Sequence, residues 1–256
     1  MKFFKWLDGK VRKTWFVWTK HFLSMKYRRF RKQNLGKYII CSLGWNCLPR
    51  MLPTEWRLKA NKKMGELSCP FDLAGHQAKV VADVIEKDFA GYLDDVIHYT
   101  DDRKFMGEYK ADFFNPNYGI MYVHDEDCQT LEDFKKRYVA RVENFRRVLS
   151  GDKPVLFVYN ARKDTSPNRD THDEIQKLCD VVMSRVHNKK SRFVVISPYD
   201  VGEIKGAHMY LSTWPVADYN WWVPLHRRTL YGIRWERKVM EFLYSELCAM
   251  LKDCEE

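Results

Sequence analysis

The chain has 256 residues, of which 45% are hydrophobic and 15% aromatic, and this composition excludes an intrinsically disordered protein. Its formal charge is +10, but residues 1–37 hold twelve Lys and Arg and one acid, which leaves 32 basic and 33 acidic residues in the remainder. Because the basic charge is confined to one end, we do not expect a nucleic-acid-binding protein.

The seven cysteines form no CxxC pair and no close grouping with histidine. An odd number of widely spaced cysteines argues against a disulfide framework, and the spacing argues against a structural metal site. We therefore expect a cytoplasmic protein with reduced thiols, no metal and no cofactor.

Residues 1–36 are expected to form a basic, amphipathic helical arm. Apolar residues recur there at steps of three or four, which places them on one stripe of a helix: Phe4, Leu7, Val11, Trp15, Trp18, Phe22 and Met25. The segment lacks the apolar run of an export signal and carries too many charges to span a bilayer. Two interpretations stay open. Residues 1–34 either lie on an anionic membrane surface, at the inner face of the membrane, or dock on the protein's own body or a second subunit.

Residues 37–256 are expected to form one α/β domain. Strand patterns cover residues 38–43, 120–123, 155–159, 193–196 and 209–211, and helix patterns cover residues 78–88, 131–149, 173–186 and 229–251. Alternation of strands and helices predicts a mostly parallel sheet with helices on its faces. The expected fold is a single three-layer α/β sandwich preceded by the amphipathic N-terminal helix.

The segment SLGWNC, from Ser42 to Cys47, follows the first predicted strand. Ligands bind at the carboxyl ends of strands in such sheets, and Gly44 permits a sharp turn. A thiol at the start of the next helix would have a lowered pKa, and nearby backbone amides with Asn46 could hold an oxyanion. Alternatively, the same turn could bind a phosphate without catalysing a reaction. Cys47 could equally be a packed core residue.

Several ordered motifs resemble an uncharacterised bacterial family of papain-like cysteine peptidases. They are SLGWNC, CPFDL (residues 69–73), YGIMYVHD (118–125), a helix ending VARVENFRRVL, and the strand KPVLFVYNAR, and together they span about residues 38–162. The resemblance implies Cys47 as the nucleophile, His124 as the general base, and Asp72 as the third member or as a structural carboxylate. The chain departs from the family at Leu73, where the family usually has Trp.

Two other sets of residues are candidate partners for Cys47. His76 is a second candidate base at a predicted helix start. The aromatic run from Trp214 to His226 carries Asp218 and His226, an acid and base that resemble the DxxH ending of SGNH-type esterases and acyltransferases at a longer spacing. Its clustered tryptophans would suit stacking on sugar rings.

The leading functional hypothesis is a cysteine-nucleophile hydrolase that acts through a thiolate at Cys47 on a peptide. One alternative is an acyltransferase or esterase that acts on an acyl or glycan group of a cell-surface polysaccharide. Another is a non-catalytic protein at the membrane that binds an anion or nucleotide through Ser42, Gly44 and Asn46.

Overall fold

The computed structural model describes residues 14–99, 104–105, 109–110, 112–122, 124–125, 127–162, 169–213, 221 and 223–255. Its main sheet has four parallel strands in the order β1 (Ile39–Ser42), β7 (Val155–Asn160), β8 (Arg192–Ser197) and β9 (Ala207–Leu211). The two central strands are nearly continuous buried apolar runs, as expected where both faces of a parallel sheet are covered. The predicted mixed α/β class with a parallel sheet is confirmed.

Three helices lie between β1 and β7 and one between β7 and β8, whereas β9 follows β8 without a described helix and two helices come after β9. In chain order, these helices are α3 (Leu48–Glu55), α4 (Ala78–Glu86), α5 (Leu131–Ser150), α6 (His172–Arg185), α7 (Pro224–Arg227) and α8 (Leu230–Asp253). A 3-10 turn covers Lys62–Met64. Three long helices begin at threonine caps, because the hydroxyl of Thr130, Thr171 or Thr229 accepts a hydrogen bond from a backbone N–H three residues on. Before the sheet, residues 14–23 are helical and α2 (Met25–Gln33) follows after a turn at Ser24.

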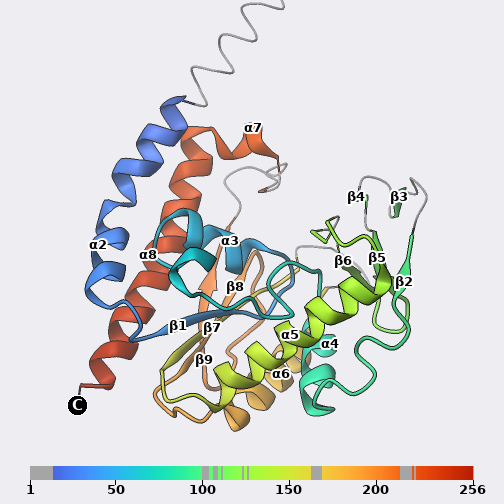
Figure 1. The fold of residues 1–256 in the computed structure, drawn as a ribbon. Helices are drawn as coiled ribbons and strands as arrows, with labels where there is room; N and C mark the ends of the chain where they lie inside the picture. The colour runs from blue at the N-terminus through green and yellow to red at the C-terminus, as the bar shows by residue number, and fades with distance from the viewer. Residues whose placement is uncertain are drawn as a thin grey trace, which may run out of the picture.

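The buried side chains form two clusters, one on each face of the sheet. Alternate residues of the strands point to opposite faces, so Cys41 and Phe157 join one cluster while Ile40 and Leu156 join the other. The first cluster contains side chains of α4, α5 and α6, and the second contains side chains of α3 and α8. Figure 1 shows α4, α5 and α6 on one side of the molecule and α8 with α2 on the other.

A smaller antiparallel region lies beside the main sheet, at the right of Figure 1. β2 (Ile97–His98), β5 (Phe113–Asn115) and β6 (Ile120–Tyr122) form one sheet, and β3 (Lys104–Phe105) pairs with β4 (Tyr109–Lys110). The strand predicted at residues 120–123 therefore belongs to a hairpin with β5 and not to the parallel sheet. The reason is local, since the Asn115 carboxamide accepts the N–H of Asn117 and closes a tight turn between the two strands.

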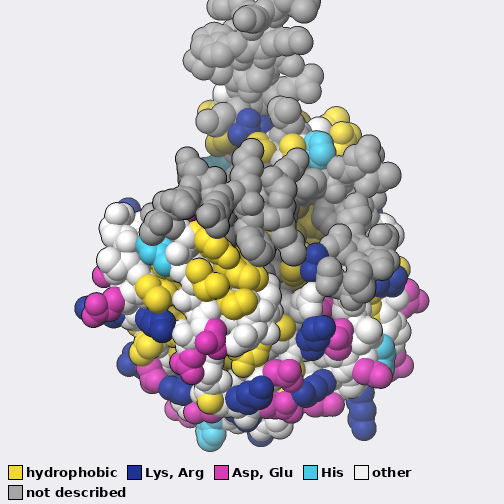
Figure 2. All heavy atoms as spheres, turned by 90° about the vertical axis from the view of Figure 1, so that its right-hand side faces the viewer, with side chains coloured by type: hydrophobic (Ala, Val, Ile, Leu, Met, Phe, Trp, Pro, Cys, Tyr) yellow, Lys and Arg dark blue, Asp and Glu magenta, His cyan; other side chains and the backbone are white. Residues whose placement is uncertain are grey.

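Charged side chains of both signs are interspersed over the lower part of the face drawn in Figure 2, which includes the antiparallel region. This mixture agrees with the nearly neutral composition of the chain after residue 37. Over the described part of that face, the side chains do not form a basic stripe of the kind that nucleic-acid binding requires.

Candidate functional site

The turn after β1 lies at the carboxyl end of the parallel sheet, as the sequence predicts. The Trp45 N–H donates to the Asn160 carbonyl (2.8 Å), and the Asn160 N–H donates to the Gly44 carbonyl (2.9 Å), so the turn is tied to the end of β7. Gly44 has φ +99°, and a Cβ there would lie 2.9 Å from the His76 carbonyl oxygen. The turn therefore requires glycine for two separate reasons.

Cys47 immediately precedes α3, but its thiol is buried. The residue is 2% exposed, it belongs to the core cluster with α8, and its Sγ lies 2.9 Å from Sδ of Met51. Burial and, to a smaller extent, the charge of Glu55 together raise the pKa of Cys47 to about 12. This shift is opposite to the predicted one, because desolvation outweighs the effect of the short helix that follows. Among the described residues, no imidazole hydrogen-bonds to this sulfur atom.

Asp72 is a buried structural carboxylate. It is 2% exposed, accepts a hydrogen bond from the Cys69 N–H (2.9 Å) and pairs with Nε of Arg50 (3.4 Å). Burial raises the pKa of Asp72, although Lys59 and Arg50 act in the opposite direction. Since Arg50 lies on α3, this ion pair fixes the segment CPFDL against the helix that starts after Cys47. The described contacts of Asp72 include no imidazole.

His76 is a neutral core histidine. Its ring is fully buried, with Nε2 2.9 Å from the Tyr92 hydroxyl and Nδ1 3.2 Å from the Ala74 carbonyl oxygen. Burial lowers the pKa of His76 to about 4. Its backbone touches the turn, since its N–H donates to the Trp45 carbonyl (3.2 Å), but its ring packs against Phe71 and does not reach Cys47.

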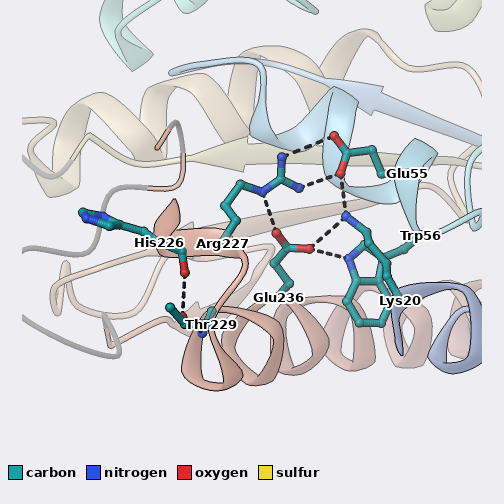
Figure 3. A network of polar contacts seen from close by, with 8 residues as sticks. Lys20, Glu55, Trp56, His226, Arg227, Thr229 and Glu236 are labelled. Carbon is teal, nitrogen blue, oxygen red and sulfur yellow. Dashed lines mark hydrogen bonds and ion pairs between the residues drawn. The ribbon is translucent and has the colours of Figure 1, made fainter. Parts of the chain in front are cut away.

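The other predicted site residues are dispersed. His124 is exposed just after β6. Ser42 is buried, with its hydroxyl 3.4 Å from the Phe71 carbonyl oxygen. His226 lies on α7, and Figure 3 shows its ring pointing away from Arg227. Asp218 lies outside the described residues. The predicted triad of Cys47, His124 and Asp72 is therefore not brought together by hydrogen bonds.

The half-buried side chains at the carboxyl end of the sheet come from the turn and from the end of β7. Oδ1 of Asn46 accepts hydrogen bonds from the Leu48 N–H (3.0 Å) and from Nδ2 of Asn160 (3.3 Å). The guanidinium of Arg162 lies 4.1 Å from the centre of the Trp45 ring. A planar cation stacked on an indole can bind an anion while the indole offers a flat surface.

A buried charged network, which the sequence analysis did not find, joins four elements beside Cys47 (Figure 3). The fully buried Glu236 of α8 accepts from Arg227 of α7 (2.7 Å), from Trp56 (2.7 Å) and from Lys20 (3.0 Å). Glu55 of α3 pairs with both Arg227 and Lys20, each at 2.5 Å. Burial opposes its ionisation, but these cations lower the pKa of Glu55. The only sequence signal was a single acid inside the apolar stripe of the last helix.

The helices over residues 14–33 have two opposite faces of unusual character. The face against the body carries polar groups and an aromatic ring, all at spacings of three or four and all buried: Lys20, Ser24, Tyr27 and Arg31. The opposite face carries the described part of the predicted apolar stripe, which is exposed: Trp15 (40%), Trp18 (72%), Phe22 (71%) and Met25 (45%). Phe4, Leu7 and Val11 lie outside the described residues. The described part of the body therefore does not cover these four side chains.

Basic side chains accompany the exposed stripe. Arg28, Arg29 and Lys32 of α2 are exposed and have no carboxylate within ion-pair distance among the described residues. Lys26 reaches Glu241 of α8 at 3.6 Å. Tyr27 fixes the opposite face by packing edge-on against Tyr244 of α8, with ring centres 5.4 Å apart.

Two further properties bear on function. Within the described residues, Asp125, Asp127 and Cys128 are grouped closely enough to suggest metal ligands, but Arg137 already pairs with both carboxylates. No helix in the described part of the chain combines the length and the apolarity needed to cross a bilayer.

Comparisons of this chain with family models, curated proteins and solved structures find no match.

Proposed function

We propose that this protein works at an anionic membrane surface and contacts it through the exposed face of residues 14–33. The observation that supports the proposal is the exposure of Trp15, Trp18, Phe22 and Met25 on one side of a helix whose other side is docked on the body. In a water-soluble helix the apolar stripe faces the core. Here the arrangement is reversed, so the apolar stripe is presented outward.

The chemistry of the exposed face fits a lipid headgroup region. Tryptophan and phenylalanine are favoured where apolar and polar environments meet, and basic residues next to them are attracted to anionic lipids. Arg28, Arg29 and Lys32 supply that charge. An exposed cluster of large apolar side chains with this charge is typical of an interaction surface.

Co-sedimentation with anionic vesicles at low salt tests the proposal. The wild-type protein should sediment with the vesicles, and the Trp18→Ala/Phe22→Ala variant should remain largely in the supernatant. Val139→Ala is the matched control, because Val139 is an exposed apolar residue (55%) on α5, away from the stripe. Equal sedimentation of both variants, or none by the wild type, would contradict the proposal.

A second proposed function is non-covalent ligand binding at the carboxyl end of the sheet. It is favoured by the Arg162 guanidinium stacked on Trp45 beside the Asn46 and Asn160 amides, at the edge where parallel sheets bind ligands. An anionic ligand with a flat ring, such as a nucleotide, fits this chemistry. ADP and pyrophosphate are suitable probes, and either should raise the melting temperature of the wild type but not of Arg162→Gln. The same rise in both proteins would remove Arg162 from the site.

The resemblance to cysteine peptidases keeps a hydrolase as the rival interpretation, and the position of Cys47 at the end of β1 is the observation in its favour. The rate at which iodoacetamide alkylates Cys47 distinguishes a hydrolase from a protein that binds its ligand without covalent chemistry. A thiol with a pKa near 12 has about a thousandfold less thiolate at neutral pH than an ordinary cysteine. Cys47 should therefore be alkylated far more slowly than the exposed Cys254. Faster alkylation of Cys47 than of Cys254 would favour the hydrolase.

A further inference from the structure

A cavity of about 190 Å³ lies beside the free edge of β1, between the end of α2 and the segment from Lys59 to Cys69. Its lining includes Arg31 of α2, Lys59, Glu66 and Lys153. Lining residues Ile39 to Cys41 belong to β1 itself, whereas the turn with Asn46 lies beyond the other end of that strand. The cavity is thus separate from the carboxyl-end surface described above.

The charges around the cavity are unequal. The charge of Lys59 is compensated, because its ammonium pairs with Glu66 (2.5 Å). The ammonium also donates to the Ile40 carbonyl, which lies on the edge of β1 away from β7. Glu66 is in turn approached by Arg50 at 4.0 Å. The one acid that lines the cavity is therefore already occupied by two cations.

Arg31 is the cation that this arrangement leaves uncompensated. The residue is 8% exposed, and its one hydrogen bond to a described residue is a long contact of 3.4 Å from Nη1 to the Lys59 carbonyl oxygen. No carboxylate of the described residues lies within 4.0 Å of it, and the charged groups that perturb it include two further cations, Arg28 and Arg57. A guanidinium has five N–H donors, so most of them find no acceptor in the described protein. None of these donors is a fully buried atom without a partner, so they face the space of the cavity, where an anion can accept from them in place of water.

Lys153 adds a second uncompensated charge. It lines the same cavity, is exposed, and forms no ion pair with any described residue. Arg31 and Lys153 approach the space from different parts of the chain, one from α2 and one from the turn before β7. The two cations therefore line the same cavity. They form a suitable site for an oxyanion, which accepts paired N–H donors from arginine.

We infer that this cavity binds a small oxyanion ligand, a phosphate or carboxylate group, through Arg31 and Lys153. Because Arg31 lies on α2, whereas β1, Lys59 and Lys153 belong to the body, a bound anion would fasten α2 to the sheet. The binding should therefore raise the thermal stability of the folded protein in a saturable manner. It does not depend on whether the exposed stripe meets a membrane.

Inorganic phosphate and malonate are the probes, added at constant ionic strength with chloride as the reference anion. The wild-type melting temperature should rise with either probe until saturation, and the ³¹P signal of phosphate should broaden in the presence of the protein. Arg31→Gln should lose both effects, and Lys153→Gln should bind at least several-fold more weakly. Arg28→Gln is the control, because Arg28 lies on the same helix but is exposed and does not line the cavity.

The readout compares each protein with and without probe, so a change in the intrinsic stability of Arg31→Gln does not obscure the result. Lys153→Gln gives a second test with an exposed residue whose replacement leaves the fold intact. Saturable binding that is equal in Arg31→Gln, Lys153→Gln and the wild type would overturn the inference. It would also be overturned if neither phosphate nor malonate bound the wild type at concentrations up to tens of millimolar.

Discussion

The two faces of residues 14–33 show opposite relations between polarity and burial. Toward the body, Lys20 and Ser24 are buried, while on the outside Trp18 and Phe22 are more than two-thirds exposed. In most helices of globular proteins the polar side faces water. The difference shows that the inner face is held at Lys20 by specific charge pairing, whereas the apolar side chains of the outer face stay exposed.

Around Lys20 the inner face is stabilised by paired charges. Lys20 would be strongly unfavourable if it were buried alone, but Glu236 and Glu55 both accept from it. Arg227 and the Trp56 indole complete the bonding of Glu236. Among the described residues, the outer face has no equivalent set of contacts, so variants on the two faces should act on different properties: folding for the inner face and binding for the outer face.

The largest effect is expected from Glu236→Gln. This change removes a charge that is shared by Lys20 and Arg227 and leaves two buried cations with Glu55 as their single acid. Removing one partner of a buried ion pair costs about 3–5 kcal/mol, so the free energy of unfolding should fall by that amount in urea titration. A loss below about 1 kcal/mol would show that the inner face does not depend on this network.

His76 is buried and neutral, whereas the Lys20 network is buried and charged. The contribution of His76 to the free energy of unfolding should therefore depend on its protonation. Its pKa is lowered to about 4 in the folded state from an ordinary value of 6.5, so the unfolded state binds the proton first as the pH falls. Stability contributed by the neutral ring is complete above pH 6.5 and is lost as the pH falls from 6.5 toward 4. The loss is about 3 kcal/mol by proton linkage.

The measurement for His76 is the free energy of unfolding at several pH values between 7.5 and 4.5, in the wild type and in His76→Asn. The difference between the two proteins should shrink toward acid pH, since the variant has no ring to protonate. A difference that stays constant over this range would mean that His76 has the same pKa in the folded and unfolded proteins, as expected of an exposed ring.

The basic residues of the outer face should change binding without changing folding. Arg29→Gln/Lys32→Gln removes two charges that have no ion pair among the described residues. Each basic residue near an anionic bilayer contributes roughly 1 kcal/mol, so vesicle affinity should fall by about tenfold or more. The reduction should disappear with neutral lipids or at high salt, while the urea midpoint stays the same. An equal reduction with neutral vesicles would contradict an electrostatic role.

The smallest effect on the free energy of unfolding is expected for the exposed ion pairs at the boundary between the two faces. Glu241 of α8 pairs with Arg237 (2.8 Å) and Lys26 (3.6 Å), and all three side chains are at least one-third exposed. Exposed ion pairs contribute about 0.2–1 kcal/mol, so Glu241→Gln should lower the free energy of unfolding by less than 1 kcal/mol. A loss as large as that of Glu236→Gln would show that the docking of α2 relies on surface charges.

Local patterns were sufficient for most of the fold. The strand predicted at residues 155–159 and the helix predicted at residues 131–149 agree with β7 and α5 to within one residue at each end. Both are long or strongly apolar, so their own residues determine them. Strand β6 was found but assigned to the wrong sheet, because pairing partners depend on the turn at Asn115 and not on the strand itself. The three-layer description and the boundary at residue 36 stay predictions.

The candidate site was less predictable, because burial is decided by distant parts of the chain. The turn at Gly44 follows from local sequence, but Cys47 is covered by residues of α8, almost two hundred positions later. The same is true of Glu236, whose partners come from three other parts of the chain. The spacing of Trp15, Trp18, Phe22 and Met25 did predict a common stripe. The spacing could not show which side of the helix docks on the body. That side is determined by the contacts of Lys20 and Tyr27 with α8.

Quenching of tryptophan fluorescence by vesicles of brominated anionic lipid tests the central claim most directly, because bromine quenches only rings that enter the acyl region. The comparison is between the wild type and Trp15→Phe/Trp18→Phe, which keeps the stripe apolar and should still sediment with vesicles. We predict that quenching is substantial in the wild type and falls clearly in the variant. Equal quenching in the two bound proteins, or none in the bound wild type, would contradict insertion of the exposed face into the membrane.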